Sequence, residues 1–250
     1  MIKFKQECEK KRLNLIYNTL LVGLGNIAIG YDLNINPKKM IKSHSQALNI
    51  HSGFKIVAGI DKSKKKMDLF KKKFCCNTYL NISDAVKNEK IDIVVVSTPT
   101  ETHESIFNEI IKSNKKYFYI LEKPLAPTYN QSNLILQKCK KNKIDMTVNY
   151  FREFIPEYKK TAYKIKNGLL GFPLRGRLFY NRGIFNNGSH FIAYSLNFFE
   201  KYLSMQIKTK YKSFKKNDPN IDIDINFSNG KMFIRYDKKM NKKIVYTIEG

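Results

Sequence analysis

The segment that decides the fold is Thr19-Leu20-Leu21-Val22-Gly23-Leu24-Gly25-Asn26-Ile27-Ala28. The apolar run at residues 19–22 predicts a buried strand, and the glycines after it predict a tight turn into a helix. In a dinucleotide-binding turn the first glycine allows the bend, the second lets the backbone approach a pyrophosphate, and a small third residue packs the helix on the strand. Gly23, Gly25 and Ala28 have this spacing, so residues 23–28 are candidate cofactor ligands. A chance glycine turn in another α/β protein is the alternative interpretation.

Outward from this turn, short apolar runs alternate with segments of helical spacing. Strands are predicted at residues 19–22, 55–60, 91–97, 117–122 and 145–149, and helices at 64–74 and 104–113. Strands that alternate with helices need crossover connections, which give a parallel sheet with helices on both faces. Residues 18–149 are therefore predicted to form an α/β domain with a doubly wound parallel sheet. Residues 1–17 are an N-terminal extension without an assigned role.

The pattern changes after residue 149. Helices are predicted at 157–167 and 189–203, and strands at 173–180, 205–211, 221–227, 231–236 and 243–248, with a hairpin turn at residues 228–230. The broad apolar face of residues 189–203 needs a sheet to cover. Residues 150–250 are therefore predicted to form a second domain of α+β type, with an open and mainly antiparallel sheet.

The composition is strongly basic. Among 250 residues, 46 Lys and Arg against 21 Asp and Glu give a net charge of +25, but only six of these basic residues are arginine. Phosphate and base recognition favours arginine, and the lysines are spread along the chain, so solvated surfaces are the preferred interpretation. The predicted partner is a small molecule and not a nucleic acid; a nucleic-acid-binding protein is the rival hypothesis, which rests on charge alone.

The cysteines and apolar segments bear on the compartment. Four cysteines without paired spacing predict neither a disulfide framework nor a metal site, and they favour a reducing environment. No segment has the apolar length of a signal peptide or of a membrane span. We therefore expect a cytoplasmic protein without a membrane span.

Further candidate residues follow the predicted strands. Asp61 ends the second strand, where a carboxylate can accept both ribose hydroxyls of NAD, and its distance from the glycines predicts an insertion around residues 31–53. Lys62 beside it leaves NADP open as the cofactor, and a helix-capping or turn aspartate is the alternative for Asp61. Later strands run into the segments 97–103 and 122–124, at carboxyl ends where open α/β sheets bind ligands.

Four motifs occur in the order of a known family: Gly23 to Ala28, Ser97-Thr98-Pro99 with His103, Glu122-Lys123-Pro124-Leu125-Ala126, and Asn187-Gly188-Ser189-His190. Over about residues 18–203 the chain thereby resembles the Gfo/Idh/MocA oxidoreductases, which include glucose-fructose oxidoreductase and inositol dehydrogenase. The resemblance implies a Rossmann domain that binds NAD and hydride transfer between nicotinamide and a hydroxyl carbon of a sugar or nucleotide-sugar. It also implies a role in polysaccharide or glycan synthesis and a homo-oligomer formed through the C-terminal sheet.

The resemblance also assigns roles to residues. Lys123 matches the lysine that hydrogen-bonds the reacting hydroxyl, and His190 matches the histidine taken as general acid or base. His44 and His51 have no predicted role beyond the surface or the core. The remaining assignments are Ser97, Thr98, Pro99, His103 and Glu122 at the cofactor, and Tyr150, Arg152, Asn186 and Asn187 at the substrate.

The chain departs from the family pattern near His190. Asn186 and Ala193 stand where many relatives carry aspartate, and the C-terminal sheet is predicted to have fewer strands than theirs. An amide cannot accept a proton, so acid/base chemistry would fall on His190 alone. A catalytically impaired or truncated dinucleotide-binding protein that acts as a sensor or scaffold is therefore the alternative function.

Overall fold

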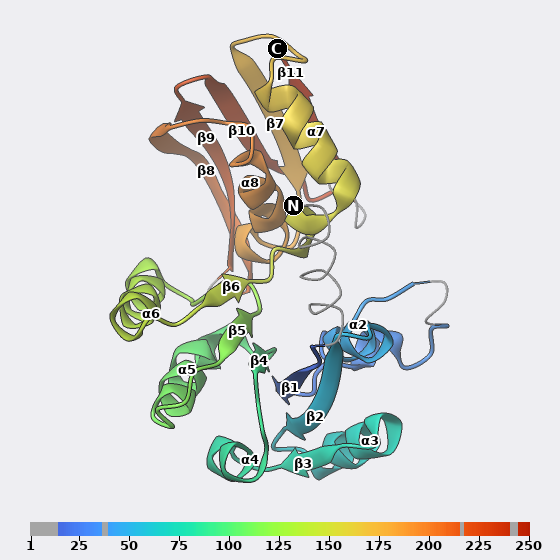
Figure 1. Cartoon of the computed structure of the whole chain (residues 1–250). Helices are drawn as coiled ribbons and strands as arrows, with labels where there is room; N and C mark the ends of the chain where they lie inside the picture. The colour runs from blue at the N-terminus through green and yellow to red at the C-terminus, as the bar shows by residue number, and fades with distance from the viewer. Residues whose placement is uncertain (1–14, 37–39, 216–217, 241–244) are drawn as a thin grey trace, which may run out of the picture. The chain divides into compact units, whose positions relative to one another are not determined.

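The structure, a computed structural model, describes residues 15–36, 40–215, 218–240 and 245–250 (Figure 1). The chain divides into two compact units, residues 1–149 and residues 150–250. Each unit has one sheet; the first has an apolar core on each face of its sheet, and the second has a core of its own. In the described ranges no helix is both long and apolar enough to cross a membrane. Most of the predicted extension at residues 1–17 lies outside the described residues.

A six-stranded parallel sheet is the framework of the first unit. Its strand order is β3-β2-β1-β4-β5-β6, which confirms the predicted doubly wound fold. Successive strands step outward from β1 in both directions, so the loops after β1 and β4 diverge at the edge where such sheets bind ligands. The strands are β1 (Tyr17–Val22), β2 (Phe54–Ile60), β3 (Asn77–Tyr79), β4 (Ile93–Val96), β5 (Phe118–Leu121) and β6 (Met146–Val148).

Helices cover both faces of this sheet because its strands are apolar on both sides. Leu20 and Val22 of β1 lie in one core with α4, α5 and α6, whereas Leu21 lies in the other core with α2 and α3. The helices are α2 (His44–Ile50), α3 (Lys64–Phe74), α4 (Ile82–Asn88), α5 (His103–Ile111) and α6 (Tyr129–Asn142).

Three of these helices, α2, α4 and α6, were not predicted. Each begins after a side chain that caps it: Ser43, Asn81 and Thr128 each accept a hydrogen bond from the backbone N–H three residues later. Such caps satisfy a backbone donor that would otherwise lack a partner at the first turn. The signal was therefore present in the sequence, but the apolar periodicity of these segments is weak.

A five-stranded sheet forms the second unit, in the order β11-β7-β10-β9-β8. Only β7 and β10 pair in parallel, so the prediction of a mainly antiparallel sheet is confirmed. Helices α7 and α8 contribute to the apolar core on one face of it. The elements are α7 (Pro156–Lys166), β7 (Leu174–Tyr180), α8 (Ser189–Ser195), β8 (Tyr202–Lys215), β9 (Asp218–Phe227), β10 (Gly230–Tyr236) and β11 (Val245–Glu249).

The predicted helix at residues 189–203 is wrong in its second half. Helix α8 ends at Ser195, and Tyr202 already belongs to β8. Asn229, in the turn between β9 and β10, donates from its amide to the Phe198 carbonyl (2.9 Å) and accepts the Glu200 N–H (2.9 Å). These tertiary hydrogen bonds pair backbone groups that follow the end of α8. The helix-like apolar spacing extends past Ser195 because Phe198 and Phe199, although not helical, are buried.

Candidate active site

One cavity of the first unit collects most of the predicted cofactor residues. It has a volume of about 700 Å3 and opens at the carboxyl ends of β1, β2 and β4. Its walls join three segments that are far apart in the sequence, which is the placement expected for a ligand site in this type of sheet. The predicted residues among its lining are Gly23, Gly25, Asp61, Lys62, Ser97, Thr98 and Pro99.

The two glycines of the turn, Gly23 and Gly25, are needed for different reasons. Gly23 has φ +89°, its N–H donates to the Ile60 carbonyl (2.8 Å), and a Cβ there would lie 2.6 Å from the Thr98 methyl carbon. Only glycine fits because both the dihedral and the space exclude a side chain. At Gly25, by contrast, a Cβ would meet no protein atom within 4 Å, although this residue lines the cavity. The open backbone at Gly25 is a cradle that fits a pyrophosphate.

The helix expected after this turn is interrupted. One helical turn forms, in which the Ile29 N–H donates to the Gly25 carbonyl (3.0 Å), and a short 3-10 helix at Gly30–Asp32 follows before the chain leaves the helix. It returns at α2, where the His44 N–H donates to the Ile27 carbonyl (3.0 Å). An uninterrupted helix would place the amide of residue 31 there. The chain between residues 31 and 43, described at 31–36 and 40–43, is therefore an excursion within the first helix, inside the predicted insertion.

Asp32 closes this excursion. Its carboxylate accepts hydrogen bonds from the backbone amides of Lys42 (2.9 Å) and Ser43 (2.7 Å) and from the Ser43 hydroxyl (2.7 Å). Burial of the side chain raises the pKa of Asp32, but these hydrogen bonds outweigh it and leave the pKa lowered. The ionised carboxylate thus ties the two ends of the excursion together.

Asp61 lies on the cavity wall, and the protein already uses its carboxylate. One oxygen accepts the Leu24 N–H (2.8 Å), the other accepts the Ser63 N–H (2.9 Å), and Lys66 Nζ lies 3.4 Å away. Asp61 is therefore a turn aspartate that also lines the cavity, and it does not cap α3, whose first residues follow Ser63. The places in the turn and at the cavity are compatible, because each carboxylate oxygen has more than one acceptor direction.

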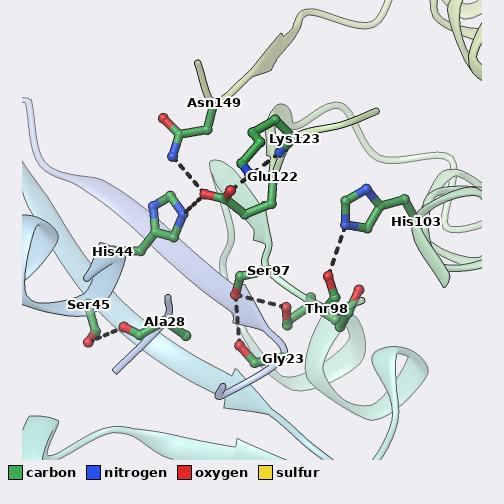
Figure 2. Close-up of polar contacts among 11 residues, drawn as sticks. Gly23, Ala28, His44, Ser45, Ser97, Thr98, His103, Glu122, Lys123 and Asn149 are labelled. Atoms are coloured by element: carbon green, nitrogen blue, oxygen red, sulfur yellow. Dashed lines mark hydrogen bonds and ion pairs between the residues drawn. The ribbon is translucent and has the colours of Figure 1, made fainter. Parts of the chain in front are cut away.

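His103 joins the loops that follow β4 and β5. Its imidazole is fully buried, with Nε2 3.0 Å from the Thr98 carbonyl oxygen (Figure 2). Nδ1 lies 3.2 Å from the Leu125 carbonyl oxygen. The ring nitrogens therefore face the two loops and not the cavity. Any effect of His103 on a bound nicotinamide would be exerted through the positions of these loops.

Glu122 and Lys123 follow directly on β5. The Glu122 carboxylate accepts hydrogen bonds from His44 Nε2 (2.7 Å), Asn149 Nδ2 (2.7 Å) and the Lys123 backbone N–H (3.3 Å) (Figure 2). Burial raises the pKa of Glu122, but the bonds from His44 and Asn149 outweigh it, so the pKa is lowered and the carboxylate is ionised. His44, to which the sequence assigned only a surface or core role, is therefore a partner of a predicted site residue.

In the second unit, His190 lies in an aromatic setting. It is buried on α8, and its ring meets the rings of Tyr150 and Phe151 edge-on, at centroid distances of 5.8 and 5.4 Å. The Arg152 guanidinium lies over the rings of Phe151 (5.1 Å) and Phe191 (5.2 Å), and burial lowers its pKa. Burial also raises the pKa of Tyr150. Three predicted substrate residues, Tyr150, Arg152 and His190, thus belong to one cluster.

The turn before His190 is held by residues that sequence reasoning missed. The Asp218 carboxylate accepts the backbone amides of Phe185 (2.8 Å) and Asn186 (3.1 Å), and Asn220 Oδ1 accepts the Gly183 N–H (2.9 Å). Gly183 has φ +85°, and a Cβ there would collide with the Asp218 carboxylate. The predicted residue Asn187 donates to the Asn181 carbonyl (2.8 Å) and thus turns toward the protein. No local motif marks Asp218, because it is distant in sequence.

The first unit is thus a dinucleotide-binding domain in fold and in the geometry of its glycine turn. The family model that matches residues 17–150 is described as "Oxidoreductase family, NAD-binding Rossmann fold" and carries the name GFO_IDH_MocA. It covers more than half of the chain, and the chain belongs to this NAD-binding family.

Relatives and solved structures agree with this. The inositol 2-dehydrogenase/D-chiro-inositol 3-dehydrogenase of Lactiplantibacillus plantarum is 28% identical over 137 residues, which are 50% of this chain and 38% of that protein. The structure of myo-inositol dehydrogenase from Lactobacillus casei with NAD(H) and myo-inositol matches with TM-score 0.72 and 17% identity, over 94% of this chain and 72% of that one. The WlbA dehydrogenase of Bordetella pertussis, with NADH and UDP-GlcNAcA, matches with TM-score 0.75 and 14% identity, over 94% and 75%.

The sequence matches are partial. The chain aligns with 29%, 26% and 38% of three curated relatives, so it spans less than half of each. The structural matches extend into the second unit and show its fold, at identities too low to carry an activity.

Proposed function

We propose that the protein is an NAD(P)-dependent oxidoreductase that transfers a hydride between nicotinamide and a hydroxyl carbon of a sugar or nucleotide-sugar. The observation that carries the proposal is the cavity of the first unit, where the backbone at Gly25 is open and two loops with the family motifs follow β4 and β5. Lys123 belongs to the second of these loops, at the carboxyl end of the same sheet.

Each residue has a proposed task. The dinucleotide, when bound, supplies the hydride acceptor or donor, the glycine turn holds its pyrophosphate, and Asp61 accepts a ribose hydroxyl. The Lys123 ammonium would stabilise the negative charge that develops on the substrate oxygen. His190 would take or return the hydroxyl proton, since imidazole titrates near neutral pH.

The substrate class rests on the relatives and on charge. Inositol dehydrogenases among them act on polyols, and the WlbA structure holds a nucleotide-sugar. Arg152, in the aromatic cluster around His190, could pair with a carboxylate or phosphate of an anionic sugar. A nucleotide-sugar would suit this arginine better than inositol, and glycan synthesis is the corresponding biological role.

The test begins with a fluorescence titration of the protein with NADH and NADPH, followed by turnover assays on a panel of polyols, sugars and nucleotide-sugars. Lys123→Ala and His190→Ala should abolish turnover while the affinity for NADH stays within about threefold. Lys116→Ala is the matched control, because Lys116 is exposed just before β5, at the opposite end of that strand from Lys123. Loss of NADH binding in both site variants would refute the assigned roles. NADH binding without turnover on any substrate would favour the impaired sensor or scaffold.

We also propose that a second copy docks on the sheet of the second unit. The face opposite α7 and α8 carries Arg235 paired with Asp224 (2.7 Å), and the partly buried Phe233 in contact with that arginine. Light scattering should report a dimer or larger assembly, which Phe233→Glu should weaken without unfolding the protein. A monomer at micromolar concentration would refute this proposal.

A further inference from the structure

His44 and Glu122 form an ion-pair geometry in a mostly buried place. His44 Nε2 lies 2.7 Å from Glu122 Oε1, and the two side chains are 14% and 12% exposed. The residues are 78 positions apart in the sequence, one at the start of α2 and the other directly after β5. A short hydrogen bond to an ionised and shielded carboxylate is among the stronger polar contacts in a protein.

The Glu122 carboxylate also binds the backbone of Lys123. The second carboxylate oxygen, Oε2, accepts the Lys123 backbone N–H (3.3 Å), while Oε1 also accepts the Asn149 amide (2.7 Å). The Glu122 N–H donates to the Val96 carbonyl (2.9 Å), and this bond holds the Glu122 backbone against the neighbouring strand β4. The carboxylate thus accepts from His44 on α2, from Asn149 after β6 and from the backbone of Lys123, and the two side-chain bonds are equally short.

His44 is itself fixed from the glycine turn. Its N–H donates to the Ile27 carbonyl (3.0 Å), and both the N–H (3.0 Å) and the hydroxyl (2.6 Å) of Ser45 donate to the Ala28 carbonyl (Figure 2). A continuous series of hydrogen bonds thus runs from the turn at residues 25–28 through α2 and Glu122 to the backbone of Lys123. All of these groups belong to the first unit.

We propose that His44 is a positioning residue: it holds the Glu122 carboxylate, and through it the backbone of Lys123, in register with the glycine turn that receives the dinucleotide. The proposal rests on the proposed function for the role of Lys123 in the reaction. A histidine that merely filled space would need no carboxylate partner, whereas this one faces the residue next to Lys123. A misplacement of about 1 Å at a reacting group can cost on the order of 100-fold in rate, so loss of this support should lower activity by roughly 10-fold to 100-fold.

The test compares His44→Phe, which keeps a ring but removes the donor, with His44→Gln, whose amide N–H can still reach the carboxylate. His51→Gln is the matched control, because this exposed histidine terminates the same helix. The first readout is amide hydrogen exchange of the segment 118–123, measured by mass spectrometry with and without NADH. The second is kcat and KM for a substrate found in the panel, and thermal unfolding verifies that each variant is folded.

We expect His44→Phe to exchange at least about fivefold faster in segment 118–123 and to lower kcat by about 10-fold to 100-fold, with KM and NADH affinity within about threefold. His44→Gln should restore most of both, and His51→Gln should match the wild type. The proposal is overturned if His44→Phe exchanges like the wild type, or if His44→Gln is as impaired as His44→Phe. A wild-type protein that binds no dinucleotide would refute the proposed function, but the exchange of the free variants would still decide the role of His44.

Discussion

Gly25→Ala should separate the folding of the first unit from its cofactor binding. A Cβ at Gly25 would meet no protein atom within 4 Å, and its backbone dihedrals lie outside the positive-φ region that favours glycine. Replacing glycine by alanine at such a compatible position gains about 0.4–1 kcal/mol, because the unfolded chain loses conformational freedom. The free variant should therefore unfold at the same urea concentration as the wild type or at a slightly higher one.

The same methyl group should reduce dinucleotide binding. It would project from the backbone into the cavity at the place where the glycine turn is open for a pyrophosphate. Because the phosphate oxygens must approach the backbone closely there, a methyl group in the gap should weaken NADH binding at least tenfold, or about 1.4 kcal/mol. Fluorescence titration with NADH measures this loss directly.

Gly23→Ala is the matched comparison, because this substitution should reduce the stability of the fold itself. Its φ of +89° and the Thr98 backbone nitrogen 2.9 Å from the added Cβ leave no room for a side chain. Strain of this kind costs about 1–3 kcal/mol, so this variant should lose stability even without cofactor. The reasoning is refuted if Gly25→Ala binds NADH like the wild type, or if Gly23→Ala is as stable as Gly25→Ala.

Three further substitutions test the supports of the two units. Tyr180→Phe should cost about 1–3 kcal/mol in urea unfolding, because the buried hydroxyl donates to the Ile221 carbonyl (2.8 Å) and accepts its N–H (2.7 Å); an unchanged midpoint would contradict this. Asp218→Ala should leave two backbone amides before His190 without their acceptor and cost about 1–3 kcal/mol, with faster hydrogen exchange at residues 183–188; unchanged exchange there would argue against this support. Asp32 has a folded-state pKa below its ordinary value of 3.8, so its contribution to stability is present above that pH and is lost as the pH falls through the lower folded pKa. Asp32→Asn should therefore flatten the acid side of the stability profile, and an equally steep acid loss in the variant would count against it.

The sequence predicted the parts of the fold that leave a local signature. The run at residues 19–22 became β1, the glycine spacing became the turn at the cavity, and the strands before Ser97 and Glu122 end where the motifs begin. These predictions succeed because buried parallel strands must be apolar and because tight turns must contain glycine, whatever surrounds them.

Sequence reasoning failed where distant residues decide the structure. Helix α8 stops at Ser195 because the chain after it bonds to Asn229, and Asp218 holds the turn before His190 from another strand. No window of a dozen residues contains both partners. Local patterns therefore could not predict these contacts, although the residue types themselves, a turn asparagine and a buried aspartate, fit their roles well.

The excursion at residues 31–43 explains why the number of residues between the glycines and Asp61 exceeds the usual interval. Asp61 lies too far along the chain from Gly25 for the usual interval of about 20 residues, yet both line one cavity. The interval reflects the path through one helix and one strand, and the bonds of His44 and Ser45 to the carbonyls of residues 27 and 28 rejoin that helix. When the excursion is left out of the count, the path returns to about the usual 20 residues. Without the excursion, His44 would follow directly on the first helical turn. A histidine that is far from the glycines in sequence therefore lies close to them in space, where its side chain contacts Glu122.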